Sequence, residues 1–204
     1  MWVTEGLFTA AVTGLVDNTT YYYQSFVTNI YGTATAETTN FTTTLYEGAY
    51  YVATNGSAGG DGSSWGMAFT NIQQALNVTA DNYEIRLAGH TFRVPAQLVW
   101  LTKAGTSIMG GGEAATTTPG SNDPSLWPTV IRRDSPAYTN RIFRIGAVTG
   151  TLAQVTILDG KLVYSAAGGA ILVTNSTFTF DGCRIVSNEI YGVGVQSLDM
   201  YGGA

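Results

Sequence analysis

The stretches T-S-I-M-G-G (106–111), T-V-I-R-R (129–133) and T-I-L-D-G (156–160) decide the expected fold, because each reads as a short apolar strand. Similar strands recur along residues 81–204, and the spacings between equivalent apolar residues are 22, 22, 27, 22 and 20. Repeats of roughly 20 to 30 residues without intervening helices are typical of stacked β-folds. The residues predicted to form one core column are Leu87, Met109, Ile131, Leu158, Phe180 and Met200.

The chain is therefore predicted to be all-β, with a parallel β-solenoid over residues 81–204 that the sequence cuts short at its C-terminal end. Residues 46–80 read as a junction that contains one helix, at 68–77. Such a helix is expected to cap the stack, because the first turn of a solenoid otherwise exposes an apolar cross-section. Its predicted apolar face consists of Phe69, Ile72, Ala75 and Leu76.

Residues 1–45 have a different pattern, with alternating strands expected at Leu7–Leu15, Tyr21–Asn29 and Thr33–Thr43. Leu15 and Tyr21 have the spacing of a tyrosine corner. The run T-T-Y-Y-Y-Q-S-F-V-T-N-I-Y-G (19–32) resembles the latter half of a fibronectin type III domain. Three strands cannot close a sandwich, so we interpret this segment as a partial antiparallel β-sandwich cut from a longer protein. The alternative is that these strands pack against the solenoid.

A second resemblance covers the junction and the first predicted turn of the stack. Y-Y-V-A-T-N-G (50–56), D-G-S-S-W (61–65), A-F-T-N-I-Q-Q-A-L (68–76) and E-I-R-L-A-G-H-T-F (84–92) together resemble the opening region of secreted right-handed parallel β-helix proteins of the pectin-lyase-like superfamily. Further along, G-G-A-I (168–171) and F-D-G-C (180–183) resemble the repeats of polymorphic outer-membrane proteins. These resemblances imply a right-handed β-helix outside the cell.

Composition excludes several classes of function. The net charge is −5 and no basic cluster exceeds Arg132-Arg133, which argues against nucleic-acid binding. No apolar run is long enough to span a membrane. The single Cys183 excludes an internal disulfide framework and reads as a small core residue. The first residues do not form a signal peptide, yet scarce Lys and abundant Thr, Asn and Tyr indicate an extracellular segment whose export signal lies upstream.

The sequence offers few groups for catalysis. The one histidine, His90, follows a strand and is interpreted as structural. Asp159 and Asp181, predicted to lie one rung apart, are weak candidates for a Ca²⁺ site, although both precede glycine and read first as turn residues. We therefore expect no cofactor and no catalytic residue, with Ca²⁺ as the one alternative.

The candidate ligand-binding residues are Trp127, Arg132, Arg133 and Tyr138, in or beside the irregular stretches 116–128 and 134–140. Trp and Tyr rings can stack on a sugar next to arginines, while solvated surface charge is the plainer interpretation of the arginines. The expected function is a non-catalytic adhesive or structural module of a secreted or cell-surface protein, with extracellular polysaccharide or cell-surface glycans as partners. The alternative is an N-terminal fragment of a polysaccharide lyase or glycoside hydrolase.

Overall fold

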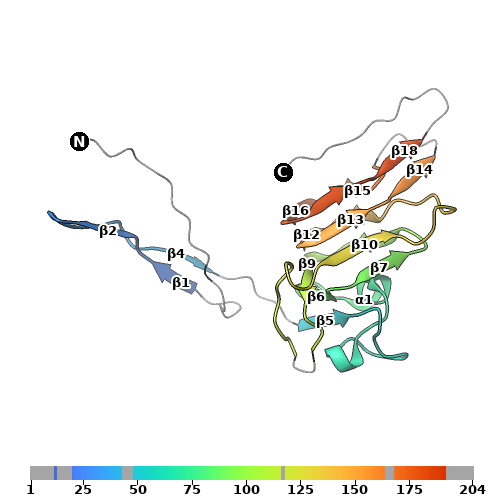
Figure 1. The fold of residues 1–204 in the computed structure, drawn as a ribbon, viewed down its shortest axis with the longest axis horizontal. Coiled ribbons are helices and arrows are strands. Elements are labelled where there is room, and N and C mark those ends of the chain that lie inside the picture. The colour runs from blue at the N-terminus through green and yellow to red at the C-terminus, as the bar shows by residue number, and fades with distance from the viewer. Residues whose placement is uncertain (1–11, 13–19, 43–47, 116–117, 164–167, 192–204) are drawn as a thin grey trace. The chain divides into compact units, whose positions relative to one another are not determined.

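The computed structural model describes residue 12 and residues 20–42, 48–115, 118–163 and 168–191. The chain divides into two compact units, Met1–Tyr46 and Glu47–Ala204. Each unit is described by itself below (Figure 1).

The described part of the first unit is one long antiparallel hairpin. β1 (Thr20–Tyr23) pairs with β4 (Thr39–Thr42), and β2 (Phe26–Asn29) pairs with β3 (Gly32–Thr35). The strand expected over Tyr21–Asn29 is thus divided in two, and the break is bridged by a hydrogen bond from the Ala36 N–H to the Ser25 carbonyl (2.9 Å). Residues 20–42 form a single ribbon rather than two layers, and the predicted tyrosine-corner residue Leu15 lies outside the described residues.

The second unit is built from parallel sheets. Their strand orders are β17-β13-β10-β7, β15-β11-β8, β16-β12-β9-β6-β5 and β14-β18. Two helical segments, η1 (Trp65–Met67) and α1 (Ile72–Val78), lie between β5 and β6. The strands are β5 (Gly48–Val52), β6 (Tyr83–Ala88), β7 (Thr91–Val94), β8 (Leu98–Leu101), β9 (Ala104–Gly112), β10 (Thr129–Arg133), β11 (Phe143–Gly146), β12 (Thr149–Ala153), β13 (Val155–Leu158), β14 (Lys161–Val163), β15 (Ile171–Thr174), β16 (Thr177–Asp181), β17 (Arg184–Val186) and β18 (Glu189–Tyr191).

From β6 onward, consecutive strands belong to different sheets, and strands of one circuit pair with their counterparts in the next circuit. The circuits are β6-β7-β8, β9-β10-β11, β12-β13-β14-β15 and β16-β17-β18. Figure 1 shows these circuits stacked above β5. β5, which lies in the predicted junction, is the edge strand of the five-stranded sheet.

The predicted core column is wrong in its register. Leu158 lies in β13 of the four-stranded sheet, whereas Phe180 lies in β16 of the five-stranded sheet. Leu158 is half-buried and pairs with Arg132, while its neighbour Ile157 is fully buried and pairs with Ile131. Met200 lies outside the described residues. The repeat of 22 residues seen in the sequence is therefore not the length of one circuit of the chain.

The true inward rows advance by unequal steps along the chain. In the five-stranded sheet the row is Ile85, Ile108, Leu152 and Phe180. The sequence interval from Ile108 to Leu152 is nearly twice as long as the interval from Ile85 to Ile108. The long step contains the irregular stretches between β9 and β10 and between β10 and β11. Insertions of this kind leave the stack intact but remove a fixed period from the sequence. The second and third rows are Phe92, Ile131, Ile157, Ile185 and Trp100, Ile145, Val173.

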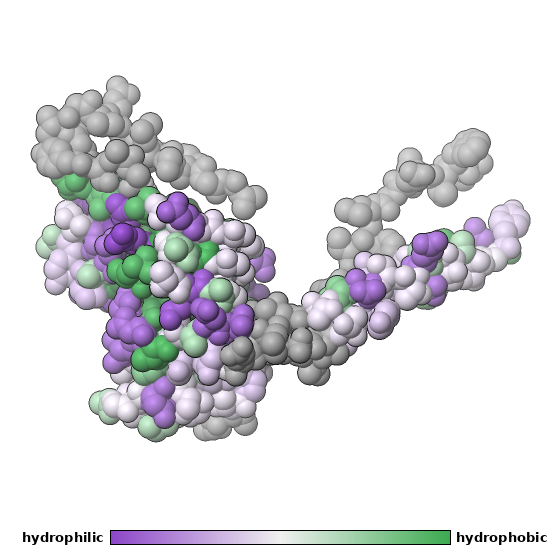
Figure 2. All heavy atoms as spheres, turned by 180° about the vertical axis from the view of Figure 1, so that it is seen from behind, coloured by the Kyte–Doolittle hydropathy of each residue, from purple (hydrophilic) through white to green (hydrophobic). Residues whose placement is uncertain are grey.

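Outward-facing positions are mixed in character. The outward row of the four-stranded sheet contains Arg93, Arg132, Leu158 and Val186 in register. Figure 2 likewise shows hydrophilic and apolar residues interspersed over one face of the stacked unit.

Helix α1 closes part of the first circuit. It begins later than the predicted residue 68, because Asn71 and Gln74 form a capping box at its N-terminus. The predicted apolar residues Ile72, Ala75 and Leu76 are buried in the core. The Gln73 amide also pairs with the edge of β8: its Oε1 accepts from the Val99 N–H (2.7 Å) and its Nε2 donates to the Val99 carbonyl (3.1 Å). The helix thus covers both apolar side chains and free backbone groups.

Single residues with left-handed backbone turn the chain between sheets. Thr102, Ala147 and Asn175 have φ of 53°, 55° and 49°, and they follow Leu101, Gly146 and Thr174, which pair in register. The same corner therefore recurs on three successive circuits with three different residues. Two other corners repeat in the same way, at Gln154 with Gly182 and at Asp159 with Ser187.

Thr102→Asn is expected to stabilise the second unit by about 1 kcal/mol, because a β-branched residue is strained at positive φ and asparagine tolerates it. The exposed Thr91 in β7 provides the control: Thr91→Asn loses β-propensity and is expected to be neutral or mildly destabilising. Denaturant midpoints of the two variants test this. Equal shifts at both positions would argue against backbone strain at the corner.

Candidate functional site

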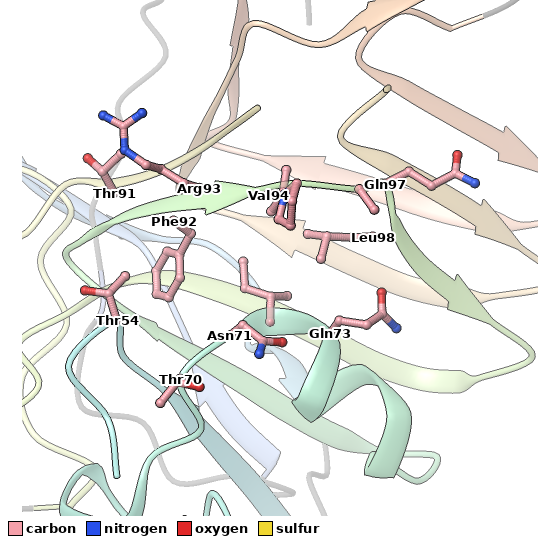
Figure 3. A pocket seen from close by; sticks show the side chains of 13 residues that line it. Thr54, Thr70, Asn71, Gln73, Thr91, Phe92, Arg93, Val94, Gln97 and Leu98 are labelled. Carbon is pink, nitrogen blue, oxygen red and sulfur yellow. The ribbon is translucent and has the colours of Figure 1, made fainter. Parts of the chain in front are cut away.

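A hollow of about 500 Å³ lies between β7, the start of β8 and the beginning of α1 (Figure 3). Phe92, Val94 and Leu98 point into it, whereas Arg93 points away. The other described side chains that line it are uncharged, so they offer no acid or base. A hollow of this size with mostly apolar and amide side chains is of the kind that holds small ligands.

Basic side chains gather around the loop at residues 134–140. Arg93, Arg132 and Arg133 line a hollow of about 260 Å³ on one side of this loop, together with Asp134 and Asp159. Arg141 lines a second hollow, of about 420 Å³, together with Tyr138, Thr139 and Asn140 of the loop. With Arg144 and Lys161 nearby, six of the nine Lys and Arg residues of the chain lie in this region. We call these six residues the basic cluster.

Arg132 is paired within the fold. Its Nη2 contacts Oδ2 of Asp159, which sits at the corner after β13. The two side chains are 37% and 28% exposed. A partly solvated pair of this kind is worth about 0–1 kcal/mol, and it leaves Asp159 neutralised by its partner.

Arg133 holds the loop in place. Its guanidinium donates to the carbonyl oxygens of Asp159 (2.7 Å), Ser135 and Tyr138 (2.8 Å). Because three carbonyl groups share one guanidinium, the loop residues between them are fixed relative to β10. Tyr138 is presented with 43% of its surface exposed. Arg133 is therefore a positioning residue for Tyr138.

Trp127 does not join this group. It precedes β10, which begins at Thr129, and it packs against Gly89. A Cβ atom added at Gly89 would lie 2.4 Å from the Trp127 Cβ. A strand rises about 3.3 Å per residue, so Trp127 and Arg133 are roughly 20 Å apart along the chain. It lines neither hollow beside the loop. The structure thus brings together Arg132, Arg133 and Tyr138 but not Trp127.

Asp159 and Asp181 are not one rung apart. Asp159 follows β13 and stacks on the corner residue Ser187, whereas Asp181 ends β16 and pairs with Ala153. The two carboxylates therefore belong to different corners of the stack, which removes the basis for a shared Ca²⁺ site. Among the residues that the structure describes, no three His, Cys, Asp or Glu side chains come together as metal ligands.

His90 joins two segments of the first circuit. Its Nδ1 accepts from the Thr54 backbone N–H (3.2 Å) and lies 3.0 Å from the Thr54 hydroxyl. Burial lowers the pKa of His90 below its usual value. Both observations favour a neutral ring with the proton on Nε2. The structure thus gives His90 a specific hydrogen-bonding role at the start of β7.

His90→Ala is expected to destabilise the second unit by about 1 kcal/mol at pH 7.5, because the Thr54 N–H loses its acceptor. Since the folded pKa is depressed, the unfolded chain binds the proton first, and wild-type stability falls as the pH drops below about 6.5. His90 is the only histidine, so the variant should show a flatter dependence between pH 7.5 and 5.5. Denaturant titrations across this range measure it, and parallel curves would contradict the assignment.

Cys183 is a packing residue in the structure. Its Sγ lies 3.1 Å from the Leu152 carbonyl, and burial raises the pKa of the thiol. A raised pKa disfavours the reactive thiolate.

One charged cluster was not foreseen from the sequence. Glu84 and Arg86 form an ion pair on the outer face of the five-stranded sheet, and Tyr51 of β5 pairs in register with Arg86. Burial raises the pKa of Tyr51. Tyr51 and Glu84 are 5% and 3% exposed, so the cluster packs the outer layer and offers no open site. The pattern E-x-R at 84–86 could have predicted this pair, because residues two apart on a strand point to the same face.

In the described ranges of the chain, no helix is long and apolar enough to cross a membrane. Comparison with protein-family models, with curated proteins and with solved structures found no match in any of the three.

Proposed function

We propose that this chain is a non-catalytic adhesive or structural module of a larger extracellular or cell-surface protein. In this proposal residues 81–204 form a right-handed parallel β-helix. The circuit-by-circuit parallel pairing supports the architecture. The hand is supported by the general preference of parallel crossover connections. The resemblances of residues 50–92 and 168–183 to secreted β-helix proteins support the location outside the cell.

The observation that supports a non-catalytic role concerns the hollow of about 260 Å³ beside the 134–140 loop. Most of the charged side chains that line it already have partners within the fold. Arg132 pairs with Asp159, and Arg133 is committed to backbone carbonyls. Arg93 reaches the Asp134 carbonyl at 3.5 Å. Cleavage of a glycosidic bond needs an acid and a base, or a base and a charge stabiliser, converging on one bond. These pairings leave the Asp134 carboxylate as the remaining acid of the hollow, and a single carboxylate does not offer that set.

The test is incubation of the purified chain with pectin, alginate and other acidic polysaccharides, with and without Ca²⁺. We expect no new reducing ends and no unsaturated product absorbing in the ultraviolet. Product that disappears in Asp159→Asn, but persists in the exposed-site control Glu37→Gln, would overturn the proposal. It would favour the alternative of a polysaccharide lyase or glycoside hydrolase fragment.

A further inference from the structure

One strand of the first circuit has an uncovered edge. β6 pairs with β5, and the Val99 N–H and carbonyl of β8 are bonded to the Gln73 amide of α1. β7 is the edge strand of the four-stranded sheet, and among the described residues β10 is its only strand partner. The hollow of about 500 Å³ lies along this edge, between β7 and the start of α1 (Figure 3). It occupies the position at which a further strand would pair with β7.

The open side of β7 presents the backbone groups of Thr91 and Arg93. The Val94 carbonyl accepts a hydrogen bond from the Asp134 N–H (3.0 Å), so the backbone groups of Val94 point toward the segment that follows β10. Backbone groups alternate in direction along a strand, so those of Thr91 and Arg93 point away from β10. Both residues are exposed, and within the described ranges their N–H and carbonyl groups have no hydrogen-bond partner. Two donors and two acceptors therefore lie along the open edge.

The side chains of β7 indicate which strand would fit. Phe92 and Val94 point into the hollow, whereas Arg93 points away from it (Figure 3). An added strand therefore needs apolar residues beside Phe92 and Val94 and a polar residue between them. Because Phe92 and Val94 are already buried, most of the binding free energy has to come from the backbone hydrogen bonds.

Arg93 favours an acidic residue at the polar position. It is exposed and pairs in register with Arg132, a like charge on the neighbouring strand. Arg132 is neutralised by Asp159, whereas the Arg93 guanidinium reaches only the Asp134 carbonyl, at 3.5 Å, and forms no ion pair among the described residues. A carboxylate directly opposite a cation on the next strand is stabilising, and a like charge is destabilising. The edge thus fits an acidic residue flanked by two apolar residues.

We propose that the edge of β7 binds an extended segment of another protein, with the sequence apolar–acidic–apolar, as an added parallel strand. The acidic residue lies beside Arg93, and the apolar residues lie beside Phe92 and Val94. The N–H groups of the two apolar residues donate to the carbonyls of Thr91 and Arg93, and the Arg93 N–H donates to the carbonyl of the first apolar residue. Main-chain hydrogen bonds supply the affinity in such strand addition, and alternate side chains supply the specificity. The proposal goes beyond the function proposed above and does not depend on it.

The experiment is an amide NMR titration of the full chain with the synthetic peptide acetyl-T-V-D-V-T-amide. We expect saturable shifts and slower hydrogen exchange at the Thr91 and Arg93 amides. N-methylation of either valine removes a donor that faces β7 and should weaken binding at least about tenfold. N-methylation of the aspartate is the matched control, because its N–H points away from β7 in the parallel register, and it should leave the affinity within about twofold.

A charge reversal tests the side-chain register. Arg93→Glu should weaken binding of this peptide about fivefold, because a favourable cross-strand pair becomes a like-charge pair. The same variant should bind acetyl-T-V-K-V-T-amide more tightly than the wild-type chain does. Arg144→Glu is the matched control: Arg144 is also exposed, but it lies on β11, which has a strand partner on each side. It changes the net charge equally and should leave both affinities unchanged.

Melting temperatures establish that both variants are folded, and the methylated peptides test the pairing on the unaltered chain. The proposal is overturned if the aspartate peptide at millimolar concentration leaves the Thr91 and Arg93 amides unchanged. It is also overturned if methylation of valine and of aspartate have equal effects, or if the charge reversal has none. Self-association of the chain that Arg93→Glu abolishes would assign the edge to a second copy and would contradict the proposed partner.

Discussion

Ile157→Asp is expected to unfold the second unit, whereas Leu158→Asp is expected to leave it folded. Ile157 is 0% exposed and pairs inward with Ile131 and Ile185. Its loss removes about 2–5 kcal/mol of packing, and an unpaired buried carboxylate adds a further penalty. Together these two penalties are comparable to the free energy of unfolding of a typical domain, roughly 5–15 kcal/mol.

Leu158 faces outward and pairs with Arg132. An aspartate there meets solvent and a guanidinium, so we expect a change within about 1 kcal/mol. Far-UV circular dichroism and urea unfolding of both variants measure the difference. If Leu158→Asp were the more damaging variant, the side chains of β13 would be assigned to the wrong faces.

Gly110→Ala is expected to cost about 2–3 kcal/mol, because this position in β9 has no room for a methyl group. A Cβ atom there would lie 2.3 Å from the Gln154 carbonyl oxygen, 2.8 Å from Val155 Cγ1 and 2.9 Å from Thr129 Cβ. The nearest atom is backbone, so relief requires one strand to move relative to another.

Gly66→Ala is the matched control. Among the described atoms, the nearest to a Cβ added at Gly66 is the Ser64 hydroxyl oxygen, at 3.9 Å, and the φ of Gly66 is not positive. Alanine there should be neutral or stabilising by up to about 1 kcal/mol, because it restricts the unfolded chain. Urea midpoints of the two variants test the contrast, and similar midpoints would mean that the sheets can separate at Gly110 without cost.

Part of the site could be predicted from the sequence. Aromatic and basic residues flanking an irregular stretch drew attention to Arg132, Arg133 and Tyr138, and the structure places these three around one loop. The roles of the residues could not be read in the same way. Arg133 binds carbonyl groups of its own chain, and the Arg141 Nη1 is left without a partner among the described residues, because each outcome depends on which backbone atoms the neighbouring circuit presents.

The sequence by itself located some of the strands, among them β6, β9 and β10, and three buried residues of the helix. Short apolar segments between turns, and apolar residues at helical spacing, report local burial. Ile72, Ala75 and Leu76 are buried for that reason.

Only the tertiary structure decided which strands stack. The inward row from Ile85 to Phe180 advances by unequal steps, because loops of different length are inserted between strands. The corners are equally hidden, since Thr102 and Ala147 adopt a left-handed backbone that their identity disfavours. The register and the corners are set by strand pairing in all the sheets together. A local sequence pattern contains no information about these long-range pairings.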